Sequence, residues 1–278
     1  MTSRKKLDII NLLGDSCKYT LHSHTEFCDG RAQMEAFARE AVKQGFTHYG
    51  FTPHSPVPIV SPCNMHRDNV SVYLGQVEKI RNEHGEHCTF LAGMEIDYLG
   101  KEWGPSTDYF QELPLDYSIG SVHFIPSQDG DLIDIDGRYE SFARKMRENF
   151  HDDLRYVVEK FYEQSIMMVE AGGFEIIGHL DKVGHNASHH QPGIEEESWY
   201  RALADELVNK IIGEGYIVEL NTKARADHGR FFPSDRLLHR LLAGGAPIIV
   251  NSDAHVPALI DASRAEAFEL LDRLKGEQ

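Results

Sequence analysis

Seven short apolar runs, rich in β-branched and aromatic residues, recur along the chain and predict β-strands. They cover residues 19–21, 48–51, 90–96, 117–122, 174–177, 216–220 and 248–250. Between them, apolar residues recur at intervals of three and four, which is the spacing of an amphipathic helix. Such faces occur within residues 34–42, 154–161, 203–211 and 237–242. Strand and helix therefore alternate along the chain.

This alternation predicts a parallel sheet covered by helices. With seven strand–helix units and no linker rich in glycine or serine, the pattern favours one closed or nearly closed α/β barrel, a single domain over residues 1–278. An open doubly wound sheet is the alternative. The chain lacks the G-x-G-x-x-G and G-x-x-x-x-G-K-[ST] motifs, so nothing marks a nucleotide site in such a sheet. The polar segments 55–70 and 182–197 are expected to be loops over one rim.

Histidines and carboxylates stand at the end of nearly every predicted strand. The first strand runs into His22-Ser23-His24, whose imidazoles lie on the same side of an extended chain. The remaining candidates are Asp29 in the first loop, His54, Glu95, His123 and His179 at the next four strands, and Asp253 and His255 after the last. Because the carboxyl ends of parallel strands meet at one rim of a barrel, these nine side chains are expected to converge. Imidazole and carboxylate ligands suit zinc, iron or manganese, so the sequence predicts a centre of two or three divalent ions.

Charge and composition narrow the choice of partners. The 278 residues include 28 Lys plus Arg against 44 Asp plus Glu, a formal net charge of −16, and no basic block. A long nucleic acid is therefore disfavoured as a partner, whereas a small molecule is compatible. We find neither a signal peptide nor an apolar run long enough to cross a bilayer. The four cysteines show no C-x-x-C spacing, which favours reduced thiols and a cytoplasmic protein.

Several of these motifs carry a family resemblance. The string Leu21-His22-Ser23-His24-Thr25, followed by Cys28-Asp29-Gly30, resembles the L-H-x-H-T/S…S-D-G opening of the PHP (polymerase and histidinol phosphatase) superfamily. The segments around His54, Glu95, His123, His179 and Asp253 agree in order. The strings at 93–98, 115–123, 178–181, 221–222 and 232–234 resemble the monofunctional histidinol-phosphate phosphatases. One departure is Pro53, where T-D-H is the commoner string, and it removes a carboxylate beside His54.

This resemblance implies a distorted (β/α)7 barrel and a cluster of three ions. By analogy, three ions are expected. The first is bound by His22, His24, Glu95 and Asp253, the second by Glu95, His123 and His179, and the third by Asp29, His54 and His255. Glu95 then bridges the first two. Ions about 3.5–4 Å apart can share a bridging hydroxide that attacks phosphorus, so no protein nucleophile is required.

Other residues are candidates for binding the substrate. Lys223, Arg225 and Arg230 follow the sixth strand and can contact phosphate oxygens, and Arg230 is the favoured catalytic cation. Asp181, or Asp97, can pair with an ammonium group. Asp253 or a metal-bound water is a candidate acid for the leaving group. By contrast, His185, His189 and His190 are interpreted as solvated loop residues.

These expectations favour a metal-dependent phosphomonoesterase that hydrolyses L-histidinol phosphate in histidine biosynthesis. One alternative is a PHP-type phosphodiesterase or phosphoesterase acting on small nucleotides or other phosphometabolites. A non-enzymatic, metal-binding regulatory barrel is the other, although all nine ligand positions hold competent residue types.

Overall fold

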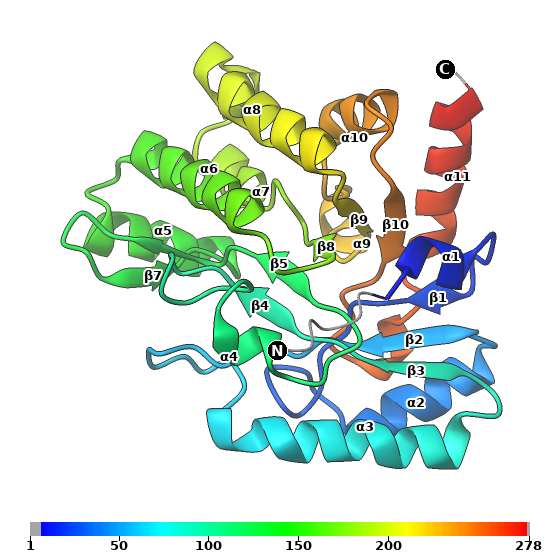
Figure 1. The fold of residues 1–278 in the computed structure, drawn as a ribbon. Helices are drawn as coiled ribbons and strands as arrows, with labels where there is room; N and C mark the ends of the chain where they lie inside the picture. The colour runs from blue at the N-terminus through cyan, green and yellow to red at the C-terminus, as the bar shows by residue number, and fades with distance from the viewer. Residues whose placement is uncertain (1–6, 277–278) are drawn as a thin grey trace.

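The computed structural model describes residues 7–276, which form an α/β fold of short parallel strands surrounded by helices (Figure 1). The strands are β1 Tyr19–Thr20, β2 His48–Phe51, β3 Thr89–Ala92, β4 Glu95–Asp97, β5 Ile119–Ser121, β6 Phe124–Pro126, β7 Leu132–Asp134, β8 Ile176–Ile177, β9 Ile217–Asn221 and β10 Ile248–Asn251. The α-helices are α1 Ile9–Leu13, α2 Met34–Lys43, α3 Val70–His84, α4 Asp108–Gln111, α5 Tyr139–Asn149, α6 Leu154–Ala171, α7 Val183–His190, α8 Ser198–Glu214, α9 Arg225–His228, α10 Asp235–Ala243 and α11 Arg264–Gly276. Single 3₁₀ turns lie at Arg67–Asn69, Ile194–Glu196 and Pro257–Leu259.

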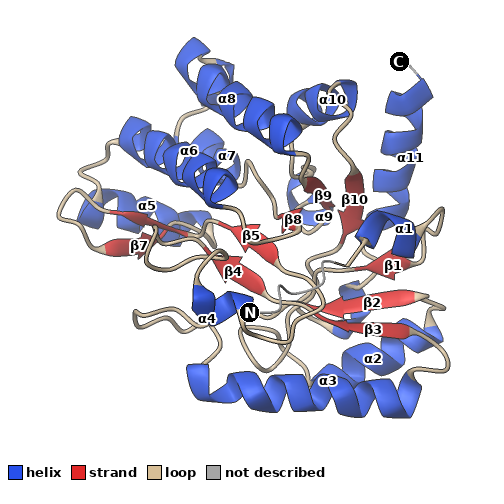
Figure 2. Cartoon of the chain, viewed as in Figure 1, coloured by secondary structure: helices blue, strands red, loops and turns tan. Residues whose placement is uncertain are grey.

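The parallel strands form two sheets rather than one continuous sheet. One has the order β1-β2-β3 and the other β10-β9-β8-β5-β4, and every pairing within them is parallel. The parallel α/β prediction is thus confirmed, whereas the expected seven-stranded arrangement is interrupted. Figure 2 shows the two groups of strands in the middle of the molecule with helices on the outside.

The interruption lies within the predicted strand 90–96. Its first half is β3, which pairs with β2, and its second half is β4, which pairs with β5. The chain crosses between the sheets at Gly93, where a Cβ atom would lie 2.6 Å from both the Thr52 side chain and the Tyr117 ring. Only glycine fits so close an approach. The crossing places Glu95 at the start of β4.

Isolated parallel bridges connect the edges of the two sheets. Ser23, just after β1, bridges Ala254, just after β10, and His54 bridges Glu95. Across the first of these junctions, the Leu21 amide donates to Asn251 Oδ1 at 2.7 Å. Both bridges join segments that contain predicted ligands, so the junctions between the sheets lie at the candidate site.

Helices cover the outer faces of both sheets (Figure 1). Helices α2 and α3 pack together and against β2 and β3, while α6, α8 and α10 pack in series beside the second sheet. Two of the apolar clusters reflect this division, with Phe37 and Tyr73 in one and Phe161 and Leu207 in the other. Among residues 7–276, no helix combines the length and apolarity required to cross a bilayer.

Two elements differ from the sequence prediction. The antiparallel hairpin β6–β7 was not expected, and most of the predicted loop 182–197 is instead helix α7 and a 3₁₀ turn. Tertiary contacts stabilise α7 despite its polar sequence. Asn186 donates to the Gly137 carbonyl at 3.1 Å, and the Ser188 hydroxyl donates to Glu195 at 2.6 Å. His185, His189 and His190 therefore lie on a helix, which corrects their interpretation as loop residues.

Candidate metal centre

The nine side chains predicted as ligands converge, eight of them in segments that follow the carboxyl ends of the parallel strands and Glu95 at the start of β4. Six of them are at most 4% exposed: His22, His24, Glu95, His123, His179 and Asp253. The other three, Asp29, His54 and His255, are half-buried at the edge of the same region. Their roles as ligands stay predictions, but the structure brings all nine together.

The first group contains His22, His24 and Asp253, and their ligand atoms lie within 4.8 Å of one another. The Nε2 atoms of the two histidines are 3.1 Å apart, and Asp253 Oδ1 is 3.1 Å from His24 Nε2. Glu95 Oε2 lies 3.3 Å from His22 Nε2 and 3.4 Å from His24 Nε2. Asp253 adopts a left-handed backbone conformation, with φ of 49°. Such conformations cluster at functional sites.

The second group contains Glu95, His123 and His179. Glu95 Oε1 is 2.9 Å from His179 Nε2 and 3.5 Å from His123 Nε2. Glu95 therefore faces the first group with one oxygen and the second group with the other. This is the arrangement that a bridging carboxylate requires.

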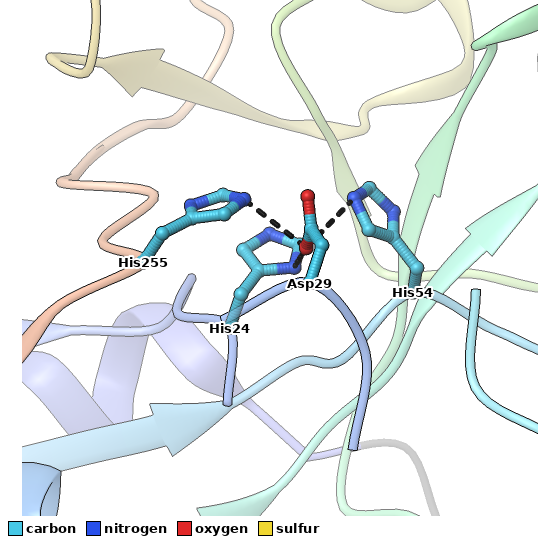
Figure 3. A group of neighbouring side chains, drawn as sticks. All are labelled: His24, Asp29, His54 and His255. Carbon is cyan, nitrogen blue, oxygen red and sulfur yellow. Dashed lines mark ion pairs between the residues drawn. The ribbon is translucent and has the colours of Figure 1, made fainter. Parts of the chain in front are cut away.

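The third group surrounds Asp29, which lies among three imidazole rings (Figure 3). Asp29 Oδ1 is 3.3 Å from His255 Nε2, 3.6 Å from His24 Nδ1 and 3.7 Å from His54 Nε2. His24 thus faces the first group with Nε2 and the third with Nδ1. A Cβ atom on Gly30 would lie 2.3 Å from the His24 backbone, so glycine allows the Asp29 loop to approach the histidine.

The donor set fits divalent cations. Glu95 Oε2 and Asp29 Oδ1 are buried without a hydrogen-bond partner, and buried carboxylate oxygens are normally paired. The nitrogens of His22 and His24 face each other across 3.1 Å, and those of His123 and His179 across 3.3 Å. Two neutral imidazoles that point lone pairs at each other repel, whereas a shared cation attracts both. Burial alone would raise the pKa of Glu95, but His22, His54 and His123 hold that pKa well below its usual value.

Two further carboxylates orient the ligand histidines. Glu219 Oε1 accepts a hydrogen bond from His22 Nδ1 at 2.6 Å, and Asp97 Oδ1 accepts one from His123 Nδ1 at 2.7 Å. Each bond directs Nε2 of the histidine toward the ligand groups, as in many metal sites. From the sequence, Asp97 was expected only as an ammonium partner, and Glu219 was not among the candidates. Glu219 could have been recognised in the sequence as a carboxylate within an otherwise apolar predicted strand.

Replacing Glu219 with Gln is expected to weaken metal binding about 10–100-fold, because a neutral amide orients His22 less strongly than a carboxylate does. Competition with a chromophoric chelator measures the affinity. Glu214→Gln, at the exposed end of α8, is the matched control. Equal affinities for the two variants would exclude this role for Glu219.

A cavity of about 930 Å³ opens onto the ligand groups and contains two lysines. Lys223 Nζ lies 3.2 Å from both Asp253 Oδ1 and His255 Nε2. Lys182 Nζ lies 2.6 Å from Asp136 Oδ2. Lys182 was not among the predicted residues, although it is a cation three residues after the ligand candidate His179.

Three of the predicted substrate-binding residues, Arg225, Arg230 and Asp181, do not line this cavity. The Arg230 guanidinium donates to both Glu195 oxygens at 2.7 and 2.8 Å and to Asp181 Oδ2 at 3.0 Å. Asp181 is fully buried in that network, and Arg225 pairs with Glu266 at 2.9 Å. Of the predicted set, the structure brings Lys223 and Asp97 to the cavity. The catalytic roles of Glu95, Asp253 and Arg230 stay predictions.

The chain matches a known protein family. The model of the PHP domain matches residues 20–223, which include seven of the nine candidate ligands. The chain belongs to the PHP domain family. A curated relative, the probable histidinol-phosphatase of Schizosaccharomyces pombe, is 26% identical over 271 residues, covering 91% of this chain and 85% of the relative.

Solved structures share the fold of this PHP chain. A Listeria monocytogenes protein described as a candidate histidinol phosphatase, HisK, superposes with a TM-score of 0.80 at 19% identity, covering 90% of this chain and 99% of that one. Histidinol phosphate phosphatase from Lactococcus lactis, in complex with zinc, L-histidinol and phosphate, superposes with a TM-score of 0.71 at 18% identity, covering 92% and 93%.

Proposed function

We propose that this protein is a metal-dependent phosphomonoesterase that hydrolyses L-histidinol phosphate to L-histidinol and phosphate in histidine biosynthesis. One observation carries the proposal: nine imidazole and carboxylate side chains lie in three adjoining groups, and five of them line a cavity that is also lined by Lys182 and Lys223. The histidinol-phosphatase name of the curated relative supports the choice of substrate.

We assign the ligand groups as the sequence predicted them. His22, His24 and Asp253 hold one ion, His123 and His179 a second, and Asp29, His54 and His255 a third, with Glu95 between the first two. Zinc, iron or manganese fits these donors. Ions bound there supply Lewis acidity toward phosphate oxygens and activate water at neutral pH.

The protein's own contribution is to orient the phosphate and to balance its charge. Lys182 and Lys223 are the cations we assign to the non-bridging oxygens, because both line the cavity whereas Arg230 is held by Glu195 and Asp181. Lys223 Nζ also lies beside Asp253. We assign this pair as the proton donor to the leaving oxygen. We assign Arg230 a structural role, in which its ion pairs hold the segment that follows His179.

The remaining proposals concern architecture and compartment. We propose that the two sheets act as one distorted (β/α)7 barrel, supported by the bridges at Ser23–Ala254 and His54–Glu95 and by a PHP match that crosses both sheets. Residues 1–278 then form a single domain. We also propose a cytoplasmic location, which the four free cysteines support.

Phosphate release from a panel of substrates tests the proposed function. The zinc- or manganese-loaded protein is expected to show a higher kcat/KM for L-histidinol phosphate than for sugar phosphates, mononucleotides or bis(4-nitrophenyl) phosphate. A preference for the diester would favour the phosphodiesterase alternative. Absence of hydrolysis for every member of the panel would favour a regulatory metal-binding protein.

A further inference from the structure

Three histidines outside the ligand groups line the same cavity as the candidate metal centre. His185 and His189 lie one turn apart on α7, and their ring centroids are 4.8 Å apart. His228, from α9, places its ring 4.3 Å from that of His185. The cavity wall that they form also contains Tyr139, and the cavity extends to His54, His123 and Asp253.

Two aromatic side chains contact the histidines of this wall. Tyr139 meets His189 edge-on at 5.5 Å, and Phe232 meets His185 edge-on at 6.5 Å. Within residues 7–276, no protein group hydrogen-bonds the ring nitrogens of the three histidines. Burial, together with His228 and His189, lowers the pKa of His185 to about 4, so this ring is neutral at pH 7. A neutral imidazole offers one N–H donor and one acceptor nitrogen.

A carboxylate without an ion-pair partner among the described residues lines the same cavity as these rings. Asp227 precedes His228 on α9, lines the cavity and has no ion-pair partner among the described residues. Two other cavity carboxylates are already paired, Asp134 with Lys145 and Asp136 with Lys182. Asp227 is therefore available to a cationic group of a ligand.

The three histidines do not form a further metal site in this arrangement. The rings of His189 and His228 are 6.2 Å apart. Among the described residues, the groups whose ligand atoms lie within 4.8 Å of one another do not include this trio. A flat organic ligand with hydrogen-bonding edges fits the wall better than a single ion does.

We propose that His185, His189, His228, Tyr139 and Asp227 form the specificity subsite that binds the heteroaromatic ring and the ammonium group of the substrate, while its phosphate lies at the metal centre. This inference rests on the proposed function and deepens it. The substrate ring stacks on the imidazoles and exchanges hydrogen bonds with them, and Asp227 pairs with the ammonium group. Sugar phosphates and simple aryl phosphates lack at least one of these groups.

Two variants, His185→Leu and Asp227→Asn, test the subsite by comparing two substrates. Each is expected to lower kcat/KM for L-histidinol phosphate about 10–100-fold, mostly through KM, because binding contacts remote from the phosphate are lost. For 4-nitrophenyl phosphate, which has no ammonium group or imidazole, we expect a change below about threefold. His239→Ala, on the exposed side of α10, is the control.

Calorimetric binding of L-histidinol to the zinc-loaded protein separates the subsite from the proposed function. Wild type is expected to bind L-histidinol, and both variants are expected to bind it at least about tenfold more weakly. Equal losses for both substrates, or unchanged L-histidinol binding, would overturn the subsite and leave the proposed function intact. If wild type shows no preference for L-histidinol phosphate, the proposed function fails, and the calorimetry still decides the subsite. Absence of L-histidinol binding to wild type overturns the subsite.

Discussion

Replacing Glu95 with Gln is expected to lower kcat/KM for phosphomonoester hydrolysis by more than about 100-fold, beyond the loss typical of a residue that only orients a ligand. Glu95 Oε1 faces His179 and Oε2 faces His22 and His24, so one carboxylate serves two ligand groups. The neutral amide removes a full negative charge from between two cations. Steady-state kinetics and elemental analysis of the same preparation measure both consequences.

Glu86→Gln, an exposed position after α3, is the matched control for this substitution. It is expected to retain wild-type activity and metal content. Near-wild-type activity of Glu95→Gln would mean that the bridging role is wrong. A loss of activity at full metal content would place Glu95 in catalysis rather than in metal retention.

Replacing Arg264 with Met is expected to lower the free energy of unfolding by about 2–4 kcal/mol, since buried acceptors lose their donor and cation–π contacts are lost. Arg264 is 1% exposed at the start of α11. Its guanidinium donates to the carbonyl of Tyr19 and, at 3.3 Å, to that of Cys17. It also lies over the rings of Tyr19 and Phe46, at 5.4 and 5.2 Å.

Equilibrium unfolding in urea, followed by circular dichroism at constant metal concentration, measures this loss. Arg273→Met, on the exposed side of the same helix, is expected to change the unfolding free energy by less than about 0.5 kcal/mol. Equal stabilities of the two variants would show that Arg264 does not anchor β1. Because β1 leads directly into His22 and His24, we also expect Arg264→Met to weaken metal binding.

Most of the candidate site could be predicted from the sequence, because two simple rules determine where its side chains lie. Alternation along an extended strand puts His22 and His24 on one side, and parallel strands bring the ends of distant segments together. These rules hold whether the strands form one sheet or two. Glu219 was harder to recognise, because its carboxylate becomes meaningful only when His22 Nδ1 is seen 2.6 Å away.

The basic residues of the site were harder to predict, because tertiary contacts determine where their side chains point. Arg230 follows the sixth strand, as expected, but its guanidinium turns to Glu195 on a distant segment. Lys182 lay within a segment predicted as a loop, although it directly precedes α7. The position of a long, flexible side chain is determined by partners that no local pattern reveals.

The fold class could be predicted from the sequence, but the boundaries of the strands and helices could not. Helix and strand periodicity indicates a parallel α/β protein, but the apolar run 90–96 suits one strand as well as two. Its division at Gly93 depends on Thr52 and Tyr117, which lie far from it in sequence. Helix α7 was likewise not predicted, because its sequence is polar. Its contacts with Gly137 and Glu195 stabilise it.

Titration of the metal-free protein with zinc or manganese tests the central claim most directly. Protein treated with a chelator is mixed with measured equivalents of metal, and phosphate release from L-histidinol phosphate is followed at each step. We predict negligible activity without metal and recovery that saturates at two or three bound ions per chain. Full activity of protein that contains no bound metal, verified by elemental analysis, would contradict the account.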